Sequence, residues 1–173
     1  MHVRRERPAD HDAVRQVHRA AFRAAGADPA AEVVEARLTD ELREDVGFLP
    51  HLSLVAVVGT DVVGHVIATR GWLEPLGHPV LGLGPLGVAP DSQRCGIGSA
   101  LVHALLAVAE AAGEQLVALL GSPAYYRRFD LVPATSLGVT PPDPAWGEHF
   151  LARRLTDTAV TGRFRYAAPF ERL

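Results

Sequence analysis

Residues 93–99 read QRCGIGS, a combination typical of a turn that binds anions. They follow an apolar run that ends at Pro90, and they precede an amphipathic stretch that predicts a helix over 97–112. The two glycines leave main-chain N–H groups unshielded, and the helix N-terminus adds unpaired donors and about half a positive charge. Gln93 and Arg94 can add side-chain donors at the rim. The pattern predicts a cradle for phosphate oxygens, although the spacing alone also fits an ordinary tight turn.

A second glycine pattern, GLGPLG over 82–87, matches the G-x-G-x-x-G fingerprint of dinucleotide-binding sites. That fingerprint needs a helix that opens directly from its glycines, whereas the sequence VAP follows here and no helix can begin before about residue 97. We therefore interpret 80–88 as a strand with a bulge near Pro85, because proline is tolerated in a sheet only at a bulge or an edge. The chain also lacks the Gly-Lys-Ser/Thr of a P-loop after residue 98, so a magnesium-bound triphosphate is not indicated.

The composition predicts a single globular domain over residues 1–173, with 48% hydrophobic and 21% charged residues. A net charge of −3 gives no general attraction to nucleic acid or acidic lipid. The single cysteine excludes an intrachain disulfide, and the eight histidines show no metal-ligand spacing, so we expect no metal. The sequence shows neither a secretory signal nor a membrane-spanning run, which predicts a cytoplasmic location.

The elements that must position the cradle follow from hydrophobic periodicity and turn residues. We expect an edge strand at 2–7, helices at 10–22 and 30–44, a hairpin of strands 52–58 and 62–69, and a loop at 71–79. After these we expect a strand at 80–88, a long helix at 97–112, a strand at 115–120, a short helix at 124–129 and a last hairpin of strands 150–154 and 162–166. This order predicts an α/β or α+β domain built on one sheet.

The wider sequence around the cradle resembles the acyl-CoA motif of the GNAT superfamily of N-acetyltransferases. The matching segments are LGVAP at 86–90, QRCGIG at 93–98 and AL at 100–101. Segment 124–131, AYYRRFDL, is similar to the second motif of the family, aromatic-Tyr-x-x-x-Gly-Phe, but Asp130 and Leu131 stand where the family has Gly-Phe, so the turn there is in doubt. Segments 83–86, 121–126 and 162–166, the last together with Phe170, are similar to one bacterial branch of predicted acetyltransferases.

The resemblance implies a GNAT-like fold, a single mixed and mostly antiparallel sheet flanked by helices. Its central strands, 80–88 and 115–120, would splay apart and admit the pantetheine arm of acetyl-CoA, the co-substrate. The Leu86 N–H would hold the oxyanion. Acyl-CoA binding is then assigned to Leu86, Gly87, Val88, Gln93, Arg94, Cys95, Gly96, Ile97, Gly98 and Ser99.

Tyr126 matches the tyrosine that serves as the acid in the family. Because an ordinary phenol titrates near pH 10 and a thiol near 8.5, complete proton transfer to the leaving thiolate is uphill by about 2 kcal/mol. Tyr126 therefore needs a pKa lowered by Arg127 or Arg128, or it acts as a hydrogen-bond donor only. The alternative of an aromatic ring that merely packs under the sheet fits Tyr125 better.

The sequence gives fewer indications of the residues that would bind or deprotonate the amine acceptor. Segment 83–88 contains no carboxylate that could act as a base. The candidates are Glu74 and His78 as bases acting through water, Trp72 and Trp146 as walls, and Glu32 and Glu35 as attractors of a cationic amine, each with an ordinary core or surface role as the alternative. A nucleophilic role for Cys95 is disfavoured because no histidine or carboxylate lies beside it in the chain.

These observations predict an N-acetyltransferase that moves an acetyl group from acetyl-CoA to a primary amine, on a small molecule or a peptide, by direct attack. The alternative is a CoA-binding sensor or structural module without turnover, suggested by the missing base and by Asp130-Leu131. A third interpretation is a nucleotide-binding domain of another kind. We expect no nucleic-acid or membrane partner, and a homodimer is possible.

Overall fold

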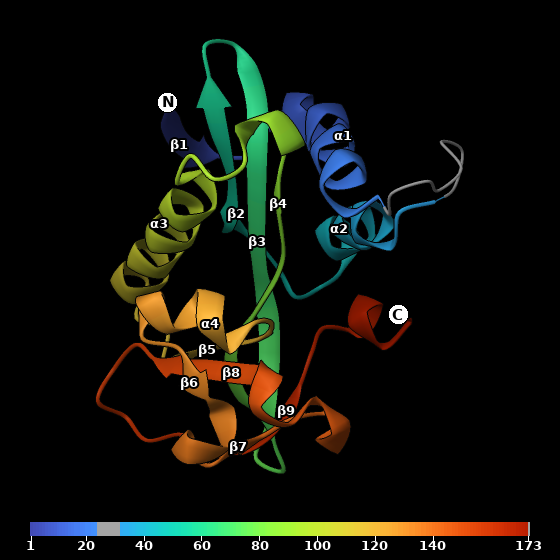
Figure 1. The fold of residues 1–173 in the computed structure, drawn as a ribbon. Helices are drawn as coiled ribbons and strands as arrows, with labels where there is room; N and C mark the ends of the chain where they lie inside the picture. The colour runs from blue at the N-terminus through green and yellow to red at the C-terminus, as the bar shows by residue number, and fades with distance from the viewer. Residues whose placement is uncertain (24–31, 173) are drawn as a thin grey trace.

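The computed structural model describes residues 1–23 and 32–172, and within them it contains one nine-stranded sheet. The principal strand order is β1-β2-β3-β4-β5-β8-β6, and β9 pairs with both β3 and β7 (Figure 1). Only the pairs β4–β5 and β7–β9 are parallel. The strands are β1 (His2–Arg5), β2 (Phe48–Val58), β3 (Asp61–Glu74), β4 (His78–Val88), β5 (Leu116–Leu120), β6 (Val132–Pro133), β7 (Val139–Thr140), β8 (Phe150–Arg154) and β9 (Gly162–Arg165).

Helices cover both faces of the sheet, as Figure 1 shows. The helix α3 (Ile97–Ala111) lies on one face, while α1 (His11–Phe22) and α2 (Val34–Glu44) lie together on the other. The short α4 (Pro123–Tyr126) follows β5. The expected helix over 30–44 begins at Val34 in the described part of the chain, and its first two positions lie outside the described residues. The mixed, mostly antiparallel architecture expected from the sequence is confirmed.

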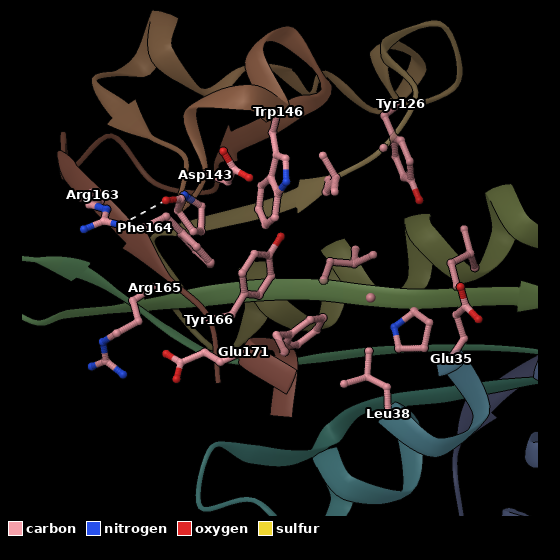
Figure 2. A pocket seen from close by; sticks show the side chains of 18 of the residues that line it. Glu35, Leu38, Tyr126, Asp143, Trp146, Arg163, Phe164, Arg165, Tyr166 and Glu171 are labelled. Carbon is pink, nitrogen blue, oxygen red and sulfur yellow. Dashed lines mark hydrogen bonds between the residues drawn. The ribbon is translucent and has the colours of Figure 1, made fainter. Parts of the chain in front are cut away.

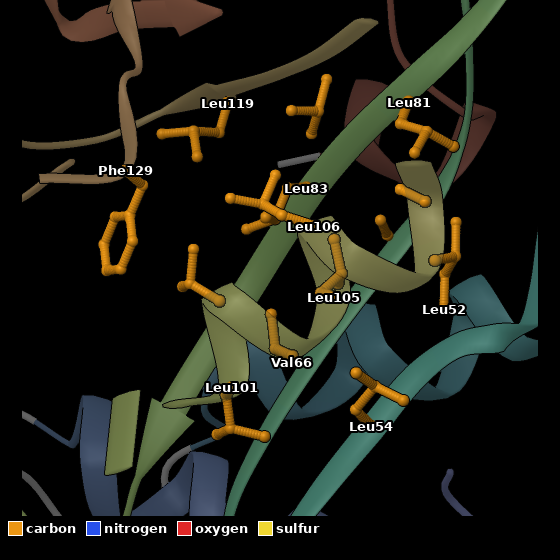
Figure 3. Packing of buried hydrophobic residues seen from close by; sticks show 14 of the residues in the cluster. Leu52, Leu54, Val66, Leu81, Leu83, Leu101, Leu105, Leu106, Leu119 and Phe129 are labelled. Atoms are coloured by element: carbon orange, nitrogen blue, oxygen red, sulfur yellow. The ribbon is translucent and has the colours of Figure 1, made fainter. Parts of the chain in front are cut away.

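The largest hydrophobic core fills the space between α3 and the sheet (Figure 3). Leu101 and Leu105 of α3 are fully buried there against strand residues such as Leu54, Val66 and Leu81. The three- and four-residue spacing of the apolar positions in α3 places them on one helix face, and the alternation along the strands supplies the opposing surface. This packing fixes the N-terminus of α3, and hence the cradle, relative to the end of β4.

The central strand β4 contains the expected bulge. Val66 of β3 pairs with Leu86 and Ala68 pairs with Leu83, so β4 has one residue more than β3 across this interval, which includes Pro85. The bulge accommodates a proline that could not donate to a regular ladder.

Beyond the bulge, β4 and β5 separate. Their pairing is confined to Leu81 with Val117 and Gly82 with Ala118, although β4 runs on to Val88. The predicted splay of the central strands is therefore present, and it lies on the same side of the pairing as the bulge.

Two local predictions were wrong. Residues 71–79 do not form a loop, because β3 continues to Glu74 and β4 begins at His78. The strands at 150–154 and 162–166 do not form a hairpin, because β8 lies between β5 and β6 while β9 pairs with the end of β3. The reason is tertiary: β3 extends past its pairing with β2, which ends at Thr69, and this leaves an edge at 72–74 that β9 completes.

Candidate functional site

A cavity of about 850 Å³ lies where β4 and β5 part. It is large enough for a drug-sized molecule. Its walls come from α1, α2, the bulged part of β4, the end of β5, α4 and the C-terminal segment. The lining residues include Phe22, Glu35, Leu38, Glu74, Leu83, Gly84, Pro85, Leu86, Leu120, Gly121, Tyr126, Asp143, Trp146, Arg163, Phe164, Arg165, Tyr166, Phe170 and Glu171 (Figure 2).

The predicted cradle forms the exposed turn before α3. Arg94 and Gly96 both adopt left-handed backbone conformations, with φ of 60° and 81°. The first hydrogen bond of the helix runs from the Ala100 N–H to the Gly96 carbonyl at 2.9 Å, so the preceding N–H groups have no acceptor within the helix. These donors and the positive end of the helix dipole lie at one exposed turn, an arrangement suited to binding an anion.

Two neighbours of the cradle have contacts that the sequence did not indicate. The Gln93 side-chain amide donates to the Val88 carbonyl at 3.0 Å, so it ties the turn back to β4. A Cβ on Gly98 would lie 2.8 Å from the Tyr125 hydroxyl, so only glycine leaves room for that tyrosine. Tyr125 thus has its hydroxyl beside the cradle as well as its ring in the core.

Tyr126 lines the cavity, and Figure 2 shows its hydroxyl directed toward β4. Burial raises the pKa of Tyr126 above its usual value, and Tyr125 nearby adds to the effect. The suggestion that Arg127 or Arg128 lowers this pKa is wrong. The Arg128 guanidinium instead lies over the Tyr125 ring, 4.8 Å from its centroid, and its Nε donates to the Tyr125 carbonyl.

The departure from the family pattern at Asp130 preserves the turn. Asp130 has φ 60° and ψ 24°, the left-handed conformation that glycine adopts most easily. Aspartate is among the non-glycine residues that tolerate this region. Leu131, which stands where the family has phenylalanine, is buried in the main core.

The carboxylates of the cavity differ in their partners. Glu74 lines the cavity but pairs with Arg165 at 3.0 Å. Asp143 accepts a hydrogen bond from the Ala145 N–H at 2.8 Å. Within the described residues, neither a hydrogen bond nor an ion pair engages the carboxylate of Glu35, which lies at the same end of the cavity as Tyr126 (Figure 2).

The other acceptor-side candidates lie elsewhere. Glu32 is exposed and pairs with Arg37 at 2.8 Å. His78 is exposed at the start of β4, away from the cavity lining. Trp72 also lies outside the lining, and the Arg165 guanidinium covers its ring at 4.3 Å. The sequence named three pairs of acceptor-side candidates: Glu32 and Glu35, Glu74 and His78, and Trp72 and Trp146. One member of each pair lines the cavity, namely Glu35, Glu74 and Trp146.

Aromatic side chains form the middle of the cavity. The rings of Tyr166 and Phe170 lie 4.4 Å apart, and Trp146 lies 6.2 Å from Tyr166 (Figure 2). Burial raises the pKa of Tyr166, against a smaller opposing effect of its hydrogen bond with the Leu120 main chain. Sequence reasoning did not assign Tyr166, Phe170 or Asp143 to the site, and only the similarity of 162–166 and Phe170 to the bacterial branch gave any signal there.

No described helix is long and apolar enough to cross a membrane. Across residues 1–23 and 32–172, no group of three or more His, Cys, Asp or Glu side chains is placed to hold a metal ion.

The family described as Acetyltransferase (GNAT) family matches residues 12–130, most of the chain. The chain belongs to the GNAT family of acetyltransferases. The matched region ends at Asp130 and includes the cradle, the splayed strands and Tyr126.

Several acetyltransferases resemble this chain over most or nearly all of its length. The Escherichia coli K12 protein named "Uncharacterized N-acetyltransferase YjhQ" is 34% identical over 148 residues, covering 79% of this chain and 80% of that protein. The crystal structure of YhbS from Escherichia coli in complex with CoA has a TM-score of 0.87 at 29% identity and covers 99% of this chain and 92% of its own. A GNAT acetyltransferase from Brucella melitensis in complex with acetyl-CoA has a TM-score of 0.79 at 31% identity, over 98% and 97% of the two chains.

Proposed function

We propose that this GNAT protein transfers an acetyl group from acetyl-CoA to a primary amine by direct attack. The observation that carries the proposal is the placement of two features at the same end of β4: the turn before α3, which Gln93 ties to Val88, and a cavity lined by Leu86 where β4 and β5 part. CoA or acetyl-CoA is bound in the crystal structures of the two similar GNAT proteins described above, which supports the same co-substrate here.

In this proposal the cofactor lies along the end of β4. Its diphosphate is held by N–H groups of residues 94–99, and Arg94 adds a side-chain charge. Its pantetheine arm enters between the splayed strands and hydrogen-bonds the main chain near Leu86 and Val88, in the manner of an added strand. Leu86 lies directly after the bulge and lines the cavity, which makes its N–H the candidate donor to the thioester carbonyl oxygen.

The chemical step forms one bond and breaks another. The amine nitrogen, once it has lost its ammonium proton, attacks the thioester carbon and gives a tetrahedral intermediate whose oxyanion the Leu86 N–H stabilises. Collapse of this intermediate breaks the C–S bond; the nitrogen gives up its second proton, and the thiolate takes up one proton to give the free thiol of CoA. The products are the acetylated amine and CoA, with one proton released overall.

Tyr126 serves the leaving group as a hydrogen-bond donor. Its raised pKa makes complete proton transfer to a thiolate more costly than the ordinary difference of about 2 kcal/mol. A buried neutral phenol can still donate a hydrogen bond to a developing thiolate, which needs no change in its protonation. The sequence left two roles open for Tyr126, a proton donor with a lowered pKa or a hydrogen-bond donor only. The raised pKa supports hydrogen-bond donation.

The alternative of a CoA-binding module without turnover loses the two reasons that suggested it. Asp130 maintains the left-handed turn of the motif, and the cavity contains a carboxylate, Glu35, that has no partner within the described residues.

The proposal is tested by measuring acetyl-CoA binding with isothermal titration calorimetry and CoA release with a thiol reagent, in the presence of a panel of primary amines. We expect saturable binding of acetyl-CoA and amine-dependent thiol release, with the N-acetylated amine found by mass spectrometry. Binding of acetyl-CoA without acetylation of any amine would contradict the proposed transfer and favour the sensor.

A further inference from the structure

The middle of the cavity has flat, apolar walls. Tyr166 and Phe170 lie 4.4 Å apart at an interplanar angle of 35°, and Trp146 stands across from Tyr166. Leu38 of α2 and Phe164 of β9 add further apolar surface (Figure 2). Aromatic walls bury large areas of a bound ring and favour offset or edge-to-face contacts with it.

The charges of the cavity favour a cationic ligand. Its two guanidinium groups are already engaged, since Arg165 pairs with Glu74 at 3.0 Å and Arg163 donates to the Pro142 carbonyl at 3.1 Å. The Glu35 carboxylate has no such partner in the described residues. An ammonium group that leaves water needs an anionic partner of this kind.

The position of the charge relative to the aromatic walls restricts the shape of the acceptor. Figure 2 shows Glu35 and Tyr126 at one end of the cavity, with Trp146 and Tyr166 between them and Arg163. An amine at the reacting end therefore extends its body between aromatic rings. A peptide would leave main-chain polar groups unpaired there, at a cost in free energy.

We infer that the acceptor is an arylalkylamine, a primary amine joined by a short alkyl chain to an aromatic ring. This inference rests on the proposed function. Glu35 binds the ammonium group and takes the proton that the nitrogen must lose before attack. Trp146, Tyr166 and Phe170 contact the ring, and Tyr126 donates its hydrogen bond to the thioester sulfur as it leaves.

Steady-state thiol release tests the acceptor class directly. The probes are 2-phenylethylamine and tryptamine, compared with spermidine and a lysine-containing peptide at the same pH. We expect kcat/KM for the two aromatic amines to exceed that of the others by about 100-fold, because burial of an aromatic ring removes a large apolar area from water. Preference for spermidine or the peptide would overturn the inference and leave the proposed acetyl transfer intact.

Two variants separate the roles within the pocket. Glu35→Gln should lower kcat/KM for 2-phenylethylamine by about 10- to 100-fold, as expected for the loss of a charged hydrogen bond, with acetyl-CoA affinity unchanged. Trp146→Ala should raise KM for 2-phenylethylamine about tenfold with little change in kcat. The matched control is Glu44→Gln, on an exposed position of α2 outside the cavity lining, which should behave as the parent protein.

A binding measurement distinguishes failure of the pocket from failure of the chemistry. Isothermal titration calorimetry with 2-phenylethylamine, compared between the parent protein and Glu35→Gln, needs no turnover. Binding that weakens in Glu35→Gln, in a protein that acetylates no amine, would support the ligand class and contradict the proposed function. If 2-phenylethylamine neither binds nor reacts, the arylalkylamine assignment is wrong.

Discussion

Tyr126 shows how burial determines what a side chain can do. Its ring packs edge-on against Tyr125 at 4.9 Å, and the low-dielectric surroundings disfavour the phenolate. The two arginines that follow it in sequence do not counter this effect, because a charge within two residues in the chain need not face the hydroxyl. The resulting neutral phenol is suited to hydrogen-bond donation across the physiological pH range.

Removing the Tyr126 hydroxyl should therefore slow the reaction without weakening the binding of acetyl-CoA. In Tyr126→Phe we expect kcat to fall by about 100-fold, comparable to the loss of one preorganised donor in a transition state. The Kd for acetyl-CoA should change less than threefold. The comparison is Tyr125→Phe, whose hydroxyl lies at the cradle, and which should retain most of the turnover. Equal kcat values for Tyr126→Phe and the parent protein would remove Tyr126 from the mechanism.

At the scale of elements, the start of α3 and the turn after α4 both depend on special backbone positions. The cradle needs an unshielded glycine at 98 because a Cβ there would lie 2.8 Å from the Tyr125 hydroxyl. The turn after α4 needs a residue that accepts a positive φ at position 130.

The variant Gly98→Ala should weaken acetyl-CoA binding about tenfold, because the new methyl group displaces Tyr125 and narrows the approach to the N–H groups. Calorimetric titration measures the effect. Combining it with Tyr125→Phe removes the oxygen that the methyl group would meet, so the double variant should recover part of the affinity. If the double variant binds acetyl-CoA no more tightly than Gly98→Ala, the methyl group obstructs the cofactor directly and not through Tyr125.

The turn at Asp130 makes a separate prediction for stability. Asp130→Gly should be close to neutral, whereas Asp130→Val should lower the free energy of unfolding by about 1–2 kcal/mol, the cost of a left-handed conformation for a residue with a branched Cβ. Urea denaturation of both variants measures this difference. Equal stability of the two would mean that the turn relaxes to a negative φ.

At the scale of the whole molecule, a buried polar network joins β1, β2, β3, α1 and α2. Arg43 and the Ser53 hydroxyl both donate to the Glu6 carboxylate at 2.5 Å, His65 Nε2 contacts Ser53 at 3.0 Å, and His65 Nδ1 lies 2.8 Å from His18 Nε2. If Ser53 donates to Glu6, then His65 donates to Ser53 and His18 donates to His65. His18 Nδ1 is left as a buried acceptor without a partner among the described residues.

The charge states of this network follow from its burial. Burial lowers the pKa of His18 to about 2, with His65 and Arg43 nearby adding to the effect. Burial also lowers the pKa of His65, although Glu6 opposes this. Burial alone would raise the pKa of Glu6, but the nearby His65, whose Nε2 lies 3.6 Å away, and the hydrogen bonds that the carboxylate accepts from Arg43 and Ser53 outweigh that and hold the pKa far below its usual range. Because His65 is neutral at neutral pH, Arg43 is the cation that keeps Glu6 ionised.

Stability should therefore decrease as the pH falls below about 6.5. In this range the unfolded chain binds a proton at His18, with an ordinary pKa near 6.5, while the folded protein does not. Each such histidine contributes a loss of about 1.4 kcal/mol per pH unit until its folded pKa is reached, and Glu6 adds a further loss below its ordinary pKa near 4.3.

Urea unfolding between pH 7 and pH 5 measures this slope. In His18→Gln, which cannot titrate, the slope should be shallower by about 1.4 kcal/mol per pH unit. The exposed histidine variant His149→Gln is the control and should retain the parent slope. A parent protein whose stability is flat over this range would contradict the buried, neutral assignment of His18.

The sequence by itself determined the parts of this protein that are local. The cradle at 93–99, the long helix after it and the bulge at Pro85 each depend on residues that are adjacent in the chain, where glycine, proline and periodicity act directly on the backbone. The match of the family to residues 12–130 then established the acetyltransferase fold.

Only the tertiary structure decided which strands pair and which side chains meet. Hydrophobic alternation marks a strand but not its partner. The sequence therefore predicts β9 beside β8, whereas in the structure β9 pairs with the end of β3. The cavity draws on residues from Phe22 to Glu171, and nothing in the sequence spacing of Glu35 and Trp146 relates them. Their proximity results from packing α2 and the C-terminal segment over the gap between β4 and β5, a consequence of the whole core and not of any one segment.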